Sequence, residues 1–184
     1  MPGVTRARIA AGAAGLVFLA GCATQTAGSA SPAGTVARPP ASTVAAPPLP
    51  PEPTPAGRAP CPYLDDDFVA QTNGQRVGRT AVSADKPHPA CFFYRPDGSE
   101  QLRVQVVVAV DPATAKALVD RAAPVDTSDP ATLPGGWEGG KQPTGSGAVF
   151  AVYKGGAAVV VASNQRQTIK VSRIAEQVIS ALRL

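Results

Sequence analysis

The sequence predicts an α+β domain in which a single antiparallel sheet of about five strands packs its helices mainly on one face. Two segments, 91–110 and 147–163, place apolar runs on both sides of a glycine-containing turn, as β-hairpins do. Three other segments carry apolar residues at helical spacing, and they span 62–73, 111–122 and 168–182. Hairpins with helices between and after them favour one sheet with helices on one side.

Each predicted hairpin has a turn signal at its centre. The first turns at Pro96-Asp97-Gly98 and the second at Lys154-Gly155-Gly156. After the first turn, apolar residues recur at every second position: Leu102, Val104, Val106, Val108 and Val110. The other side of that strand begins with Arg103 and Gln105, as expected if this face is partly exposed to solvent. Residues 76–82 are expected to add a short edge strand.

The predicted helices also have start and stop signals. Pro62 suits the first position of the first helix, and Gly74 suits its C-terminal stop. The aspartates at 65–67 fall in the first turns, where the helix dipole favours anions. A calcium loop would need ligands at alternating positions and a central glycine, which this segment lacks. Asp111 and Pro112 open the second helix as N-cap and first residue.

A charged head and a short apolar run open the chain. Arg6 and Arg8 precede the apolar segment 9–20, which is shorter than the ~20 residues that cross a bilayer and fits a secretory signal peptide over 1–21. Its end, Leu19-Ala20-Gly21-Cys22, resembles the bacterial lipobox, in which the Cys22 sulfur takes diacylglycerol and the new amine is acylated. An ordinary signal peptide with an incidental cysteine is the alternative. The sequence thus predicts a lipoprotein anchored at Cys22 to the extracytoplasmic face of the cell membrane.

The segment 22–60 is predicted to be a disordered linker that begins with the lipidated cysteine. Ten of the chain's twenty prolines fall between Pro32 and Pro60, among alanine, serine and threonine. Such a composition buries too little apolar surface to offset the entropy of ordering it. The linker and the leader also carry most of the excess positive charge. Residues 61–184 hold 13 Lys and Arg against 12 Asp and Glu, so no nucleic-acid partner is expected.

Residues 61–184 are long enough for one globular domain, and they contain the other two cysteines. Export would place Cys61 and Cys91 in an oxidising compartment, where an even pair is typical of a disulfide. With Cys22 lipidated, these two are the partners that remain. A metal-binding or redox pair is the alternative, but the spacing is not that of a CxxC motif and no cluster of histidines accompanies it.

The motifs that could support catalysis or cofactor binding are incomplete. Gly135, Gly140 and Lys141 match the glycine and lysine spacing of a phosphate-binding loop, but Gln142 stands where magnesium coordination needs Ser or Thr. The single histidine, His88, has no nucleophile motif around it. Asp120, Asp126 and Asp129 could pair as acid and base, but helix caps and turns explain them better. No catalytic residue, metal site or cofactor is therefore predicted.

The segment 124–146 is expected to be a long loop, and it contains the only tryptophan. Loops of this length are often functional. Trp137, flanked by paired glycines, could be a rigid aromatic contact with a ligand or partner. It could equally tuck under the loop and pin it to the sheet.

Several blocks of the domain resemble an actinobacterial lipoprotein family catalogued as domain of unknown function 2020. These blocks are CPYLDDDFVAQTNGQRV, PACFFY, AAPVDTSDP, GGWEGG and GAVFAVYKGGAAVVVASNQ. The resemblance covers essentially all of residues 61–184 and implies an exported lipoprotein with a disulfide between Cys61 and Cys91. It carries over no catalytic residue, because none is assigned in the family. A composition rich in Ala, Gly, Pro and Arg and poor in Lys agrees with that source.

These observations favour a non-catalytic, membrane-anchored lipoprotein that acts as a protein-interaction or envelope-associated module. This hypothesis predicts an exposed patch near Trp137 and the hairpins. A small-molecule or lipid-binding carrier is the alternative, and its mark would be an apolar cavity between sheet and helices. A hydrolase is the third possibility. The expected partners are the membrane, through Cys22, and an envelope protein or lipid ligand.

Overall fold

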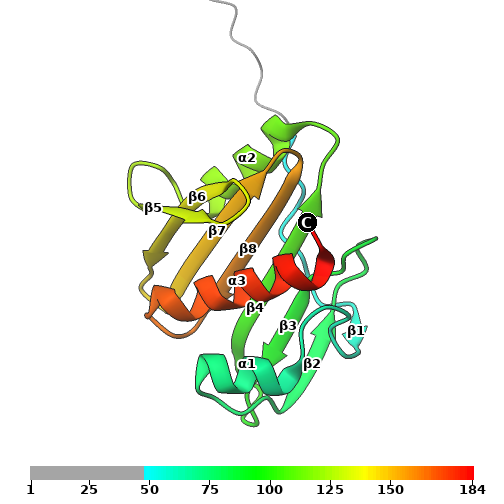
Figure 1. Cartoon of the computed structure of the whole chain (residues 1–184). Helices are drawn as coiled ribbons and strands as arrows, with labels where there is room; N and C mark the ends of the chain where they lie inside the picture. Colours follow the sequence, from blue (N-terminus) through cyan, green and yellow to red (C-terminus); the bar gives the residue numbers. More distant parts are fainter. Residues whose placement is uncertain (1–47) are drawn as a thin grey trace, which may run out of the picture. The chain divides into compact units, whose positions relative to one another are not determined.

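The computed structural model describes residues 48–184, and these form eight strands and three helices. The predicted signal peptide, Cys22 and the linker as far as residue 47 lie outside the described residues. All strands belong to one antiparallel sheet, in the order β1-β2-β3-β4-β8-β7-β6-β5 (Figure 1). The strands are β1 Gly57–Arg58, β2 Arg79–Val82, β3 Cys91–Tyr94, β4 Glu100–Val108, β5 Asp129–Leu133, β6 Trp137–Pro143, β7 Ala148–Lys154 and β8 Ala157–Ser163.

The prediction of about five strands is wrong, because three strands come from segments expected to be irregular. β1 belongs to the expected linker, and β5 and β6 form a hairpin inside the expected loop 124–146. Their sequences, GR, DPATL and WEGGKQP, are rich in Gly, Pro and charged residues, which are depleted in strands. Pairing with a neighbouring strand overrides this weak preference: β1 pairs with β2 and β5 with β6. Six consecutive residues of β6 pair with β7, from Glu138 with Tyr153 to Pro143 with Ala148.

The three helices form where the sequence predicts them, with one shifted start. They are α1 Asp66–Asn73, α2 Pro112–Ala122 and α3 Thr168–Leu182. α1 begins four residues after Pro62 because Asp65 is its N-cap and accepts hydrogen bonds from the backbone N–H groups of Asp67 and Phe68. Gly74 ends α1 in the left-handed conformation, with φ of 75°.

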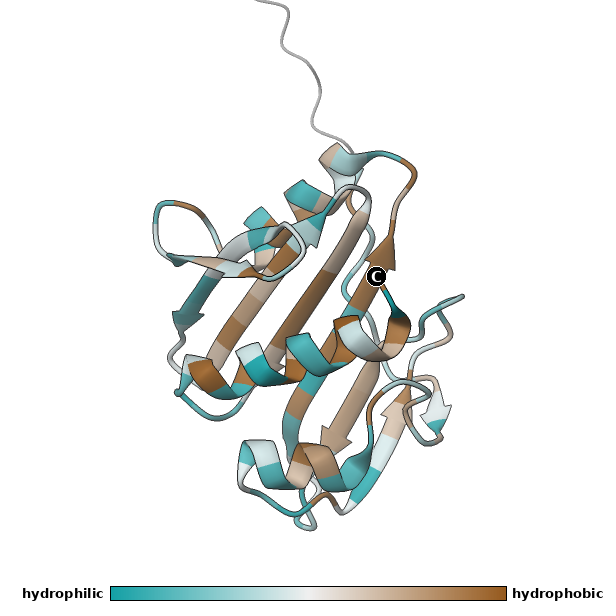
Figure 2. Ribbon diagram, in the orientation of Figure 1, coloured by the Kyte–Doolittle hydropathy of each residue, from teal (hydrophilic) through white to brown (hydrophobic). Residues whose placement is uncertain are grey.

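The helices cover both faces of the sheet, not mainly one. α1 and α3 pack on one face, where buried side chains of α3, such as Ile174, meet Phe150 and Val161. α2 packs on the opposite face, against Ala151 and Ala158 (Figure 1). β7 and β8 are therefore buried on both sides, which explains their nearly continuous apolar runs, drawn mainly in brown in Figure 2.

Residues 48–56, named the strap below, lie against the domain although the sequence assigns them to the linker. Leu49 packs against the apolar cluster beneath α2, Pro53 is buried, and the Ala56 N–H donates to the Val82 carbonyl at 2.8 Å. β1 follows and pairs with β2 at one edge of the sheet. The ordered part of the chain therefore begins at least as early as residue 48.

Cys61 and Cys91 form a disulfide, as predicted, with Cα atoms 5.6 Å apart. Cys61 lies between β1 and α1, and Cys91 is the first residue of β3. The bond closes a loop across 30 positions of sequence. The bond thereby links the segment between β1 and α1 to β3, which lies between β2 and β4 in the sheet.

Candidate functional site

Trp137, which the sequence offers either as a partner contact or as a structural residue that pins the loop, lies in the hydrophobic core. It is the first residue of β6, its side chain is 1% exposed, and it belongs to the cluster between the sheet and α3. The Lys154 ammonium lies 5.2 Å from the centre of the indole ring, on the neighbouring strand. The structure therefore places Trp137 in the structural role and leaves no exposed indole for a partner.

The other sequence candidates do not assemble into a reaction centre. His88 is half-buried in the segment between β2 and β3, and Asp126 and Asp129 are exposed near the start of β5. Across residues 48–184, no three His, Cys, Asp or Glu side chains come together as metal ligands would. In the same range, no helix has the length and hydropathy needed to cross a bilayer.

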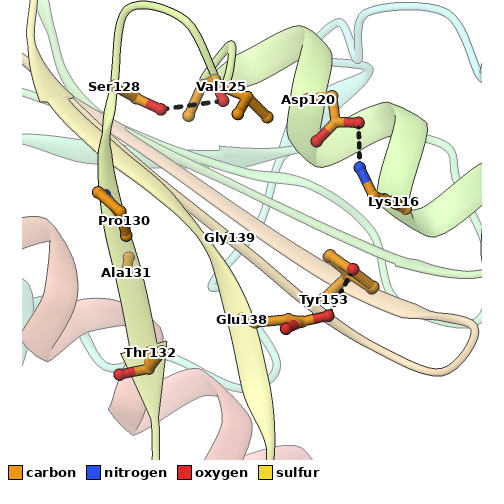
Figure 3. A pocket seen from close by; sticks show the side chains of 11 residues that line it. Lys116, Asp120, Val125, Ser128, Pro130, Ala131, Thr132, Glu138, Gly139 and Tyr153 are labelled. Atoms are coloured by element: carbon orange, nitrogen blue, oxygen red, sulfur yellow. Dashed lines mark hydrogen bonds and ion pairs between the residues drawn. The ribbon is translucent and has the colours of Figure 1, made fainter.

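A hollow of about 310 Å³ lies between α2 and the β5–β6 hairpin (Figure 3). Its charged side chains and its tyrosine come from α2, β6 and β7, and β5 with the segment before it contributes both apolar and hydroxyl side chains. The main contributors are Lys116, Asp120, Val125, Pro130, Ala131, Glu138 and Tyr153. Val125 is 78% exposed, so an apolar side chain stands at the rim.

Two glycines of β6 allow the hairpin to approach α2 and β7. A Cβ atom on Gly139 would stand 2.1 Å from the Ala151 carbonyl oxygen and 2.9 Å from Cγ1 of Val119. A Cβ atom on Gly140 would stand 2.5 Å from Oγ of Ser128. Gly140, which matches the second glycine of a phosphate-binding loop, and its neighbour Gly139 therefore serve close packing.

Two hydrogen-bonded pairs set the chemistry of the hollow. The Tyr153 hydroxyl donates to Oε1 of Glu138 at 2.6 Å, and the Lys116 ammonium contacts Oδ2 of Asp120 at 2.6 Å (Figure 3). The hydrogen bond to Glu138 is the main cause that raises the pKa of Tyr153 to about 12, with partial burial and the charges of Glu138 and Asp120 adding to it. The phenol therefore holds its proton at neutral pH.

The sequence analysis did not predict Glu138, Lys116 or Tyr153 as site residues. Glu138 and Tyr153 are opposite partners of β6 and β7, fifteen positions apart in sequence. The only signal that could have joined them is the register of this strand pair, and β6 was expected to be loop. Asp120 was considered as an acid–base residue, and it forms an i,i+4 ion pair with Lys116 on the surface of α2.

Comparisons with known proteins identify a family without a described activity. No curated protein shows significant similarity to the chain. The model of one family, described as domain of unknown function (DUF2020), matches residues 43–184. This match includes the strap and every strand and helix of the structure. The chain therefore belongs to the DUF2020 family.

Proposed function

We propose that this protein is an exported actinobacterial lipoprotein, anchored through diacylglycerol on Cys22, that acts as a non-catalytic interaction module at the outer face of the cell membrane. The leader with Arg6 and Arg8, the apolar run and the Leu-Ala-Gly-Cys junction support the anchor. The proline-rich stretch from Cys22 to the strap serves as a spacer between membrane and domain.

The observation that carries this proposal is the Cys61–Cys91 disulfide. The two cysteines lie 30 positions apart and are brought within bonding distance by β3 and the segment before α1. Stable disulfides of this kind are typical of oxidising, extracytoplasmic compartments and rare in the cytosol. The bond therefore supports export independently of the leader sequence.

The hollow supports binding more than catalysis. Its tyrosine has a raised pKa, and its lysine is paired with a carboxylate, so neither group is poised as a nucleophile or base. The exposed Val125 and the aromatic ring of Tyr153 instead offer contact surface beside paired charges. We assign the interaction surface to this hollow and its rim.

A lipid carrier is less well supported. Its apolar ligand would need space between the sheet and the helices, and buried side chains occupy that space on both faces. Val161 and Ile174 on one face and Leu118 and Ala158 on the other are at most 1% exposed.

Site-specific cross-linking in the native cell tests the interaction surface. A photoreactive side chain is placed at Val125, on the rim of the hollow, or at Ile169, which is similarly exposed at the start of α3. The proposal predicts a discrete protein adduct from position 125 and none of the same mass from position 169. Equal adducts from both positions, or adducts to lipid alone, would contradict it.

A further inference from the structure

The strap carries a carboxylate into a site formed by two arginines. Oε2 of Glu52 lies 3.6 Å from Nη1 of Arg103 on β4, and Oε1 lies 3.3 Å from Nη2 of Arg121 on α2. Nη1 of Arg121 also donates a hydrogen bond to the Pro50 carbonyl at 3.0 Å. Two guanidinium groups from separate elements thus converge on a single glutamate.

This convergence requires an anion. Each guanidinium lies within 3.6 Å of the same carboxylate, so the two positive charges are close neighbours. Their side chains are only 35% and 33% exposed, which weakens the screening by water. Arginine is also the side chain whose planar donors best match a carboxylate. Without Glu52, the pair would repel and would favour another carboxylate in its place.

The site has room beside Glu52. A hollow of about 160 Å³ adjoins the ion pairs, and its far side is formed by apolar residues of α2, β7 and β8. These include Leu118, Val149 and Val160. The site therefore combines two cations with an apolar wall, which suits a carboxylate carried on a partly apolar peptide.

The contacts of the strap are weak enough for another peptide to replace it. Five of its nine residues are prolines, which have no N–H to donate to the sheet. Glu52 is 63% exposed, and ion pairs with an exposed partner contribute little to stability. Proline-rich segments nevertheless dock well in grooves, because their extended conformation is already fixed before binding.

We propose that the groove around Arg103 and Arg121 is a binding site for the carboxylate of an extended, proline-flanked segment of a partner protein, and that Glu52 of the strap occupies it as an internal ligand. The strap shows the chemistry of the ligand, a glutamate between prolines. Release of the strap opens the site to the partner and frees the segment that joins the domain to its N-terminal chain.

The internal ligand competes strongly because it is tethered. A short flexible connection gives an effective concentration on the order of mM. A partner peptide therefore binds weakly while Glu52 is in place. Neutralising Glu52 while keeping its shape should strengthen the binding of an added peptide, whereas a purely structural Glu52 would give no such gain.

The test uses the chain from residue 22 with Cys22→Ser, so that it carries no lipid. The probe is a fluorescent synthetic peptide with the sequence of residues 48–56, and binding is measured by fluorescence anisotropy. Glu52→Gln should bind the probe up to about 5-fold more tightly than the chain with Glu52, because it removes the ion pairs that help to hold the tethered competitor in place. Glu176→Gln, a matched change on α3, should leave the affinity unchanged.

Two further arms identify the recognised group. A probe with glutamine in place of its glutamate should lose most of its affinity for the Glu52→Gln chain, and Arg121→Glu in that chain should have the same effect. Equal binding of the glutamate and glutamine probes would overturn the proposal, as would equal affinity of the Glu52 and Glu52→Gln chains. Far-UV circular dichroism of each variant establishes that the fold is retained.

Strap displacement gives an independent readout. The backbone amide signals of the four non-proline residues of the strap, followed by NMR, should move towards their unbound positions when the chain with Glu52 is saturated with probe; these residues are Leu49, Glu52, Thr54 and Ala56. Binding that leaves these signals in place would locate the peptide elsewhere and overturn the proposal. These outcomes do not depend on what binds at the α2–hairpin hollow.

Discussion

The same face of the sheet is covered in two different ways. Over β6, β7 and β8 the cover is α2, whose side chains Leu118 and Val119 are 1% exposed against Ala151 and Ala158. Over β4 the cover is the strap, in which Leu49 is only half-buried and the specific contacts are exposed ion pairs. One cover is held by deeply buried side chains, and the other by ion pairs, hydrogen bonds and shallower apolar contacts.

This difference means that α2 is a permanent part of the fold, whereas the proposed release of the strap would leave the core intact. Burial of an aliphatic side chain stabilises by ~1.5–3 kcal/mol. A surface ion pair contributes about 0–1 kcal/mol and weakens with salt. The helix cover therefore belongs to the cooperative fold, whereas the strap is able to leave without unfolding the domain.

Loss of the disulfide should have the largest effect on stability. The double change Cys61→Ala and Cys91→Ala removes a cross-link that spans 30 positions and fixes the segment between β1 and α1 to β3. The chain-entropy relation gives a loss of ~3–4 kcal/mol in the free energy of unfolding. Urea denaturation measures this value. A loss below ~1 kcal/mol would show that this segment is held by other contacts.

Equivalent truncations in the two covers should differ in cost. Leu118→Ala removes a fully buried side chain from α2 and should cost ~2–4 kcal/mol. Leu49→Ala makes the same change in the strap, where the side chain is half-buried, and should cost less than ~1 kcal/mol. Thermal or urea unfolding of both variants measures the difference. Equal costs would remove the distinction between the covers.

The hollow beside α2 should give a pH signature. The pKa of Tyr153 is raised to about 12, above the ordinary tyrosine value near ~10. The hydrogen bond to Glu138 therefore adds its full stabilisation below pH ~10 and loses it as pH rises towards 12. Absorbance titration at high pH, with Tyr153→Phe as the reference, measures this pKa. Glu138→Gln should lower it, and an unchanged value would exclude Glu138 as the cause.

Glu52→Gln should have the smallest effect on stability. The ion pairs with Arg103 and Arg121 are partly exposed, so their loss should cost about 0–1 kcal/mol at low salt. Near 1 M salt the Debye length falls to ~3 Å, and the difference from the unsubstituted chain should vanish. Urea denaturation at both salt concentrations measures it. A large cost that persists at high salt would make the strap part of the cooperative fold.

Local patterns predict the elements that have strong signals of their own. The capping residues Asp111 and Gly74 and the two hairpin turns each follow from nearby sequence, whereas the cysteine pair follows from the export signal and the cysteine count. β5 and β6 could not be predicted in this way, since β6 is a strand because it pairs with β7, and β5 is a strand because it pairs with β6. The hollow depends on that pairing, which brings Glu138 to Tyr153, and so its residues stayed hidden as well.

The strap also shows what sequence composition alone does not predict. Its composition, with prolines at five of nine positions, predicts a disordered linker, whereas the strap packs against the domain. Composition does not reveal that Arg103 and Arg121, which are far away in sequence, converge on Glu52. Long-range charge pairing is a property of the fold and leaves no periodic trace in the chain.

Under the proposed function, Cys22 anchors the chain to the membrane, and the strap lies in sequence between this anchor and the rest of the domain. The intact mass of the protein extracted from the membranes of its own cells tests this directly. We predict a chain that begins at Cys22 and carries diacylglycerol on sulfur and a fatty acyl group on its amine. A chain that retains residues 1–21, or one whose Cys22 thiol is unmodified, would contradict the proposed lipoprotein.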